Sequence, residues 1–135
     1  MAEIEVELRN VAATGAALGW AGAHTLVVDR PDGKAGGQGL GFNGGQLLAL
    51  AIGGCFCNDL RYAAAELGAE LADIAVSVKL TLEGSPLVAT GAEMTVRCTG
   101  ASDREVGEVI AHATRNCTVA NSVRAGFPVD IRRGR

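Results

Sequence analysis

The longest apolar run of the chain reads Leu47-Leu48-Ala49-Leu50-Ala51-Ile52-Gly53-Gly54-Cys55-Phe56-Cys57. Because apolar side chains continue to Leu60 and Gly68 is a typical helix terminator, we expect a helix from about residue 45 to residue 67. Its apolar side chains occupy most of the helical wheel, so this helix needs apolar cover on more than one side. The run is too short to span a bilayer, and two glycines interrupt it.

Beyond this helix, two segments of alternating polarity predict a β-hairpin. Apolar residues alternate with polar ones over residues 76–82 and again over residues 92–98, with Gly84-Ser85-Pro86 between the two segments. Such alternation is typical of half-buried strands, and a short connection joins antiparallel neighbours. We therefore expect these two strands to pair with each other.

The last third of the chain predicts two helices and a strand. Ser102-Asp103-Arg104-Glu105 matches a capping box, which marks the start of a helix that we expect to end near Asn116. A second, short helix is expected from about residue 118 to residue 124, ended by Gly126. The segment 127–131 alternates in polarity again and predicts a terminal strand.

The N-terminal third predicts strands and a loop. Residues 3–9 and residues 24–29 have strand-like patterns, and six glycines between residues 35 and 45 predict a loop. The resulting fold class is α+β, in a single domain of residues 1–135. We expect its strands to form antiparallel sheets packed around the long buried helix.

The overall composition excludes several classes of partner. The chain has 135 residues, 48% of them hydrophobic and 4% aromatic, and a net charge of −3. This balance provides no basic surface for nucleic acid or an anionic membrane, and few rings on which bases could stack. The acidic N-terminus has no basic leader, so we expect a cytoplasmic protein. In that reducing compartment the four cysteines are expected to be free, catalytic or metal-binding rather than a disulfide framework.

The breadth of the apolar surface on the long helix also predicts an oligomer. A chain of this size has about one sheet and two smaller helices with which to cover that surface. We therefore expect a second copy to cover the remainder, in an intertwined homodimer with this helix near the two-fold axis.

Two of the cysteines lie in positions that suit redox chemistry. Cys55 is inside the apolar helix, and Cys117 is where one predicted helix ends and the next begins. A helix N-terminus favours the thiolate, so we expect a lowered pKa for Cys117. A thiol in the apolar surroundings of Cys55 needs a cationic or hydrogen-bonding partner to become reactive. A redox pair requires one shielded, activated thiol and a second thiol close enough to resolve it.

Three sequence features together resemble the osmotically inducible protein C and organic hydroperoxide resistance (OsmC/Ohr) family. They are the glycine-rich loop, the helix that contains Gly53-Gly54-Cys55-Phe56, and the later Cys117-Thr118-Val119-Ala120-Asn121. The likeness extends from about residue 24 to residue 131. It implies the OsmC-like fold, a thiol peroxidase that needs no cofactor or metal, and Cys55 and Cys117 as its catalytic residues. Cys55 would attack an organic hydroperoxide, Cys117 would form a disulfide with it, and an external dithiol would reduce that disulfide.

The resemblance also identifies where the chain departs from the family's pattern. Members that act as peroxidases carry a glutamate about ten residues before the first cysteine, where this chain has Gly45 followed by Gln46. They also carry an activating arginine in the early strands, and Arg9 and Arg30 are the arginines that precede the long helix here. This pattern is similar to a divergent branch of the family.

The other reactive side chains have simpler interpretations. Cys57 lies roughly 200° around the helix from Cys55, so we expect it to fill space in the core. Cys98 is expected on the inward face of its strand. We interpret His24 and His112 as ordinary surface or partly buried side chains, and Asn121 as a structural hydrogen-bonding group.

Three functions from different classes remain open. The favoured one is a dithiol-dependent peroxidase that acts on organic hydroperoxides. The second is a binding or sensing protein that lacks peroxidase turnover and takes an apolar small molecule at the dimer interface. The third, ranked last because its spacing matches no standard zinc motif, is a metal site made of Cys55, Cys117 and either His112 or Cys57.

Overall fold

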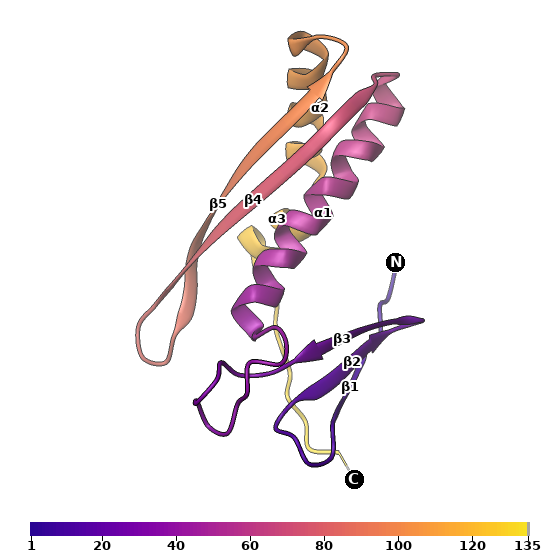
Figure 1. Ribbon diagram of the computed structural model, residues 1–135. Coiled ribbons are helices and arrows are strands. Elements are labelled where there is room, and N and C mark those ends of the chain that lie inside the picture. The colour runs from indigo at the N-terminus through magenta and orange to yellow at the C-terminus, as the bar shows by residue number, and fades with distance from the viewer. Residues whose placement is uncertain (135) are drawn as a thin grey trace. The chain divides into compact units, whose positions relative to one another are not determined.

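The computed structural model describes residues 1–134 and has the expected α+β composition, with antiparallel sheets and three helices (Figure 1). Its chain forms two compact units, Met1–Leu48 and Ala49–Arg135. The elements in chain order are β1 (Glu7–Asn10), β2 (Ala17–Ala21), β3 (His24–Val28), α1 (Gly44–Leu67), β4 (Leu71–Glu83), β5 (Val88–Gly100), α2 (Asp103–Asn116) and α3 (Thr118–Ala125).

The first unit contains a three-stranded antiparallel sheet in the order β1-β2-β3. The central strand β2 was not expected, because Ala17-Leu18-Gly19-Trp20-Ala21 does not alternate clearly in polarity. Pairing with both neighbours holds it in place, since Gly19 lies opposite Leu8 on one side and Leu26 on the other. The first strand is shorter than predicted, because its pairing with β2 begins only at Glu7.

The glycine-rich segment after β3 is a loop, as predicted, and a buried carboxylate organises it. Asp29 is only 4% exposed and accepts backbone hydrogen bonds from Arg30, Gln38 and Leu40 at 2.8, 3.1 and 3.0 Å. The bond from Leu40 is the main reason that the pKa of Asp29 is lowered. Gly41 packs against the backbone of Val27 so closely that no side chain would fit there. Asp29 therefore fixes the path of the chain toward α1.

The bounds of α1 confirm the predicted helix almost to the residue. Its start is capped reciprocally: the backbone N–H of Gln46 donates to Asn43 Oδ1 at 2.9 Å, and that of Asn43 donates to Gln46 Oε1 at 3.0 Å. Its end is followed by Gly68 with φ +66°, a conformation that glycine adopts without strain. Within residues 1–134, none of the helices is both long enough and apolar enough to cross a membrane.

The second unit is dominated by a long β4–β5 hairpin that runs alongside α1 (Figure 1). The two strands pair antiparallel as predicted, with Val76 opposite Val96 and Val78 opposite Met94. A Cβ atom at Gly53 would lie 3.0 Å from a methyl group of Val78. This small residue therefore lets the helix and the hairpin approach closely.

One apolar core joins α1, the hairpin and α2. Leu60, Val109 and Cys117 are the largest side chains that are fully buried in it. The start of α2 confirms the predicted cap, because the backbone N–H of Glu105 donates to the Ser102 hydroxyl at 3.2 Å. The core cluster consists of Phe56, Leu60, Ala63, Ala64, Val109, Ala113 and Cys117.

The prediction of a terminal strand at residues 127–131 was wrong. This segment has no regular secondary structure, and its three large apolar side chains are exposed. A segment of alternating polarity forms a strand only where the edge of a sheet can pair with it. Within the described residues, no sheet edge pairs with this segment. Its exposed apolar side chains are Phe127, Val129 and Ile131.

The core predicts a large cost for shortening Leu60. Leu60→Ala is expected to lower the free energy of unfolding by about 2–5 kcal/mol, because the side chain is fully buried. Urea denaturation followed by circular dichroism measures this loss. The matched control is Leu67→Ala on the same helix, whose side chain is 45% exposed. Equal losses in the two variants would contradict the described core.

Candidate functional site

Cys55 and Asp59 lie one helical turn apart on the same face of α1. The Cys55 thiol donates a long hydrogen bond of 3.5 Å to Asp59 Oδ2. Residues four apart on a helix are neighbours, and a helix as long as α1 holds them rigidly. Cys55 is partly buried and packs against the edge of the core. The helix therefore provides a thiol with a carboxylate beside it.

Cys117 occupies the junction between α2 and α3. It is the C-cap of α2 and the N-cap of α3, with extended backbone angles of φ −65° and ψ 108°. Asn121 stabilises the junction, since its side-chain amide donates to the Arg115 carbonyl at 3.1 Å. This bond confirms the structural role expected of Asn121. The sharp change of direction between the helices turns the Cys117 side chain into the core.

These elements bring both predicted cysteines together with one carboxylate. The sulfur atoms of Cys55 and Cys117 and a carboxylate oxygen of Asp59 all lie within 4.8 Å of one another. Both cysteines are free thiols. Since a disulfide requires a sulfur–sulfur distance of about 2.05 Å, the two sulfur atoms would have to move closer by at most about 2.8 Å to join.

The prediction of a lowered pKa for Cys117 was wrong. Burial raises the pKa of this thiol from 9.0 to about 11. The backbone N–H of Ala120 in the first turn of α3 acts in the opposite direction and lowers the pKa, but burial outweighs it. Hydrogen bonding with Asp59 and Cys55 raises the pKa further. At neutral pH the site therefore holds Cys117 as a protonated thiol.

Sequence reasoning missed Asp59. The family pattern has its carboxylate about ten residues before Cys55, where this chain has Gly45 and uses the neighbouring Asn43 and Gln46 to cap α1. The signal that could have identified Asp59 is its spacing of four residues from Cys55 within a predicted helix.

A pocket of about 400 Å³ leads to Cys117 within the second unit. Its wall combines apolar and polar surface, and Arg124, whose side chain ends in a guanidinium, is among its lining residues. That guanidinium donates a 2.7 Å hydrogen bond to Asn121 Oδ1. The remaining lining residues are Phe56, Met94, Val96, Ile110, Thr114 and Ala120.

A polar pocket of about 390 Å³ reaches Asp59. Asp59, Glu66 and His112 line it, and His112 Nε2 lies 3.3 Å from Glu66 Oε2. His112 is therefore paired with Glu66 and does not belong to the cluster of Cys55, Asp59 and Cys117.

The other residues singled out from the sequence lie away from this cluster. Cys98 packs against the core as expected, and burial raises its pKa. Cys57 is half-buried and is not among the three clustered groups. In the first unit, the Arg30 guanidinium donates to the Gly15 carbonyl at 2.8 Å and lies 3.6 Å from Asp29. Arg30 thus has a structural role in the N-terminal loop.

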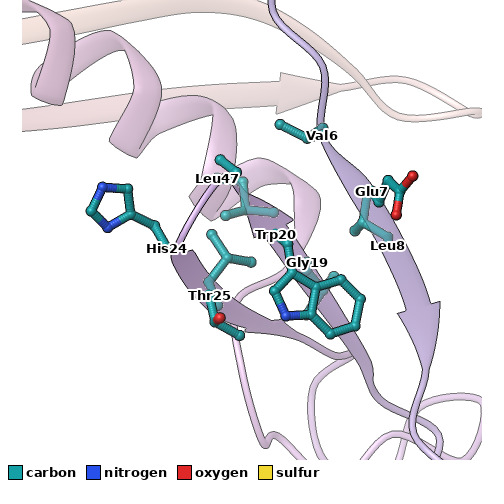
Figure 2. A pocket seen from close by; sticks show the side chains of 11 residues that line it. Val6, Glu7, Leu8, Gly19, Trp20, His24, Thr25 and Leu47 are labelled. Carbon is teal, nitrogen blue, oxygen red and sulfur yellow. The ribbon is translucent and has the colours of Figure 1, made fainter.

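The first unit has a pocket of its own, about 230 Å³ in volume. Figure 2 shows it between the sheet and the start of α1, with Trp20, His24 and Leu47 among the labelled side chains. Its other walls include the apolar side chains of Val6 and Leu8. None of the four cysteines lines this pocket.

The raised pKa of Cys117 predicts a pH-dependent stability. Below pH 9 the thiol is protonated in both the folded and unfolded states, whereas between pH 9 and about 11 only the unfolded state loses the proton. The free energy of unfolding is therefore expected to fall as pH rises through this window. Urea denaturation across this range, in buffer with a chelator, measures the fall. Cys117→Ala should show a smaller decline, and an identical decline in the variant would contradict this assignment.

Solved structures share the fold of this chain. An OsmC-like protein from Mycoplasma pneumoniae has a TM-score of 0.76 at 13% identity, with 91% of this chain and 88% of that chain covered. A hypothetical protein from Aquifex aeolicus has a TM-score of 0.75 at 20% identity, covering 93% and 89%. The organic hydroperoxide resistance protein OsmC from Legionella pneumophila has a TM-score of 0.69 at 22% identity, covering 92% and 90%.

Comparison with sequence families agrees with the structural likeness. A comparison with curated proteins gave no match. The profile of the family described as OsmC-like protein matches residues 36–132, which include α1, the hairpin, α2, α3 and both clustered cysteines. The chain therefore belongs to the OsmC-like protein family.

Proposed function

We propose that this protein is a thiol-dependent peroxidase that reduces organic hydroperoxides through Cys55 and Cys117. The observation that supports this function best is the meeting of two free thiols and the Asp59 carboxylate within 4.8 Å. Solved relatives described as organic hydroperoxide resistance proteins share the fold. Expected partners are an organic hydroperoxide and an external dithiol.

Cys55 is the better candidate for the first attack. Cys117 is fully buried and its raised pKa keeps it protonated, whereas Cys55 is only partly buried. The thiolate, not the thiol, is the nucleophile toward peroxides. A carboxylate does not itself stabilise a neighbouring thiolate. Asp59 can instead act as a general base that takes the Cys55 proton while the sulfur attacks the peroxide, through the bond that joins them. No lowered pKa is then needed at Cys117.

The reaction would proceed in three balanced steps. The Cys55 sulfur attacks the hydroperoxide, a sulfur–oxygen bond forms, the oxygen–oxygen bond breaks, and the alkoxide takes a proton to leave as an alcohol. Cys117 then gives up its proton and its sulfur attacks the Cys55 sulfenic acid, a sulfur–sulfur bond forms, and the sulfenic hydroxyl leaves with that proton as water. An external dithiol reduces the disulfide back to two thiols and is itself oxidised.

The pocket beside Cys117 favours an organic substrate. Phe56, Met94, Val96 and Ile110 line it with apolar surface, whose burial favours an alkyl or aryl group. Hydrogen peroxide has no such group. We therefore expect cumene hydroperoxide to be reduced with a higher kcat/KM than hydrogen peroxide.

The pocket of the first unit supports a second candidate, the binding of a small apolar molecule without turnover. Its wall of Val6, Leu8, Trp20 and Leu47 offers the necessary surface (Figure 2). This function would leave peroxide consumption at the rate of an unactivated thiol. The peroxidase assay below therefore distinguishes the two candidates.

Exposed apolar side chains support a homodimer. On α1, Leu50 and Tyr62 are 53% and 72% exposed and lie away from the face that packs into the core, and Leu67 in the last turn is 45% exposed. Val6 and Leu8 in the first unit are exposed as well. Single chains seldom leave this much apolar surface in contact with water. Covering it with a second copy would also bring two copies of α1 together.

Peroxidase turnover is expected to depend on Cys55. In a dithiol-coupled assay with cumene hydroperoxide, Cys55→Ser should abolish peroxide consumption, because the attacking sulfur is lost. Cys117→Ser should consume about one equivalent and stop at the sulfenic acid. Asp59→Asn should lower kcat/KM by about 100-fold, since proton transfer is lost. Cys57→Ser is the matched control with wild-type turnover, and full activity in Cys55→Ser would contradict the proposal.

The homodimer is expected at micromolar concentration. Light scattering coupled to gel filtration should give twice the mass of one chain. Leu50→Glu is expected to shift the mass toward that of one chain, because it places a charge among the exposed apolar residues of α1. Glu70→Gln, at a surface position just beyond the helix, is the control. A single-chain mass for the wild type would contradict the dimer.

A further inference from the structure

The cluster of Cys55, Asp59 and Cys117 has the dimensions of a metal site. With a zinc–sulfur bond of about 2.3 Å, tetrahedral geometry places two thiolate ligands about 3.8 Å apart. A thiolate and a carboxylate oxygen then lie about 3.5 Å apart. Cys55 and Asp59 already have this separation, at 3.5 Å, and all three donor atoms lie within 4.8 Å of one another. A shift of about 1 Å would therefore bring all three to bonding distance of one ion.

Each ligand is held by a rigid part of the second unit. Cys55 and Asp59 are four residues apart in the middle of the 24-residue helix α1. Cys117 is fixed at the end of α2 by burial and by the hydrogen bonds of Asn121 at the junction. Ligands on helices hold their positions more closely than ligands on loops. Little order has to be gained when an ion binds.

The polar pocket lets a hydrated cation approach the cluster from the side of Asp59, which is the one member of the cluster that lines it. Asp59, Glu66 and His112 line this pocket, so its acidic side chains attract a divalent ion. Three protein ligands leave the fourth tetrahedral position for water. Among residues 1–134 no other three such ligands meet in this way. The metal hypothesis drawn from the sequence placed His112 or Cys57 in the third position, which the structure gives to Asp59.

We propose that the reduced protein binds one thiophilic divalent cation, of the Zn²⁺ or Cd²⁺ class, through the sulfurs of Cys55 and Cys117 and the carboxylate of Asp59. Two thiolates favour this class over Mg²⁺ and Ca²⁺, which take oxygen ligands. Each thiol that binds the ion releases its proton to solvent. The binding does not depend on the proposed peroxidase function.

Metal binding would protect the thiols from oxidation, and this consequence does rest on the proposed function. A sulfur that donates an electron pair to the ion no longer has that pair available to attack a peroxide. The ion also holds the two sulfurs apart at about 3.8 Å, beyond the length of a disulfide bond. Removal of the ion by a chelator restores the reactive pair.

Titration with Cd²⁺ tests the site directly. The reduced full-length protein should develop a thiolate-to-cadmium charge-transfer absorption that saturates at about one ion per chain, and Zn²⁺ should remove it by competition. Cys55→Ser should lose most of this absorption, and Asp59→Asn should bind about tenfold more weakly. Cys57→Ser is the matched thiol control and should titrate like the wild type.

Three results would overturn the site. They are no saturable absorption in the wild type, an undiminished absorption in Cys55→Ser, or an equal loss in Cys57→Ser. Because these readouts do not use peroxide, they decide the metal site even if the wild type shows no peroxidase turnover.

A second measurement on the wild type avoids any variant that fails to fold. Zn²⁺ should slow the alkylation of Cys55 by iodoacetamide at least about tenfold, as followed by mass spectrometry of peptides. The alkylation of Cys57 should be unchanged. Equal protection of Cys57, or no protection of Cys55, would contradict the proposed ligands.

Discussion

The second unit depends on burying one face of α1 against the hairpin and α2. Leu60 and Val109 are fully buried where these elements meet, and the long hairpin gives the helix a surface along its length. Burial of apolar surface is the main favourable contribution to folding, and the helix would not be stable in water on its own. The opposite face of α1 still carries exposed apolar side chains such as Leu50 and Tyr62.

The same burial determines the chemistry of the site. The core encloses Cys117 at the point where α2 and α3 change direction, and exclusion of water disfavours its thiolate. Cys55 lies at the edge of the core, where solvent and a carboxylate are both within reach. Two chemically identical side chains thus have different environments only 4.8 Å or less apart. This difference in burial is the reason that the proposed reaction gives the attacking role to Cys55 and the resolving role to Cys117.

The sequence was sufficient to predict those elements that depend only on residues close to one another in the chain. The long helix, the cap at Ser102 and the glycine after Leu67 depend on neighbouring residues, and the structure confirms each of them. Strand β2 and the non-existent strand at residues 127–131 depend instead on whether a partner edge is present, which no local pattern reveals.

The candidate site likewise has features that the sequence indicates and features that depend on the folded structure. The two cysteines could be named from their sequence frames, and they do meet. Asp59 was not predicted because the family pattern has its carboxylate about ten residues before the first cysteine, whereas here a carboxylate lies a single helical turn after Cys55. The pKa of Cys117 was misjudged because its position at a helix start can be read from the sequence, whereas the depth of its burial is a tertiary property.

The location of Cys55 and Cys117 has a consequence for the whole unit. A bond between them would close a loop of about 60 residues that contains the rest of α1, the hairpin and α2. In the chain-entropy description, closing a loop of that size removes freedom from the unfolded chain worth about 4 kcal/mol. The oxidised protein would then melt at a higher temperature than the reduced protein. Its heat stability would report the redox state of the chain, without any change in fold.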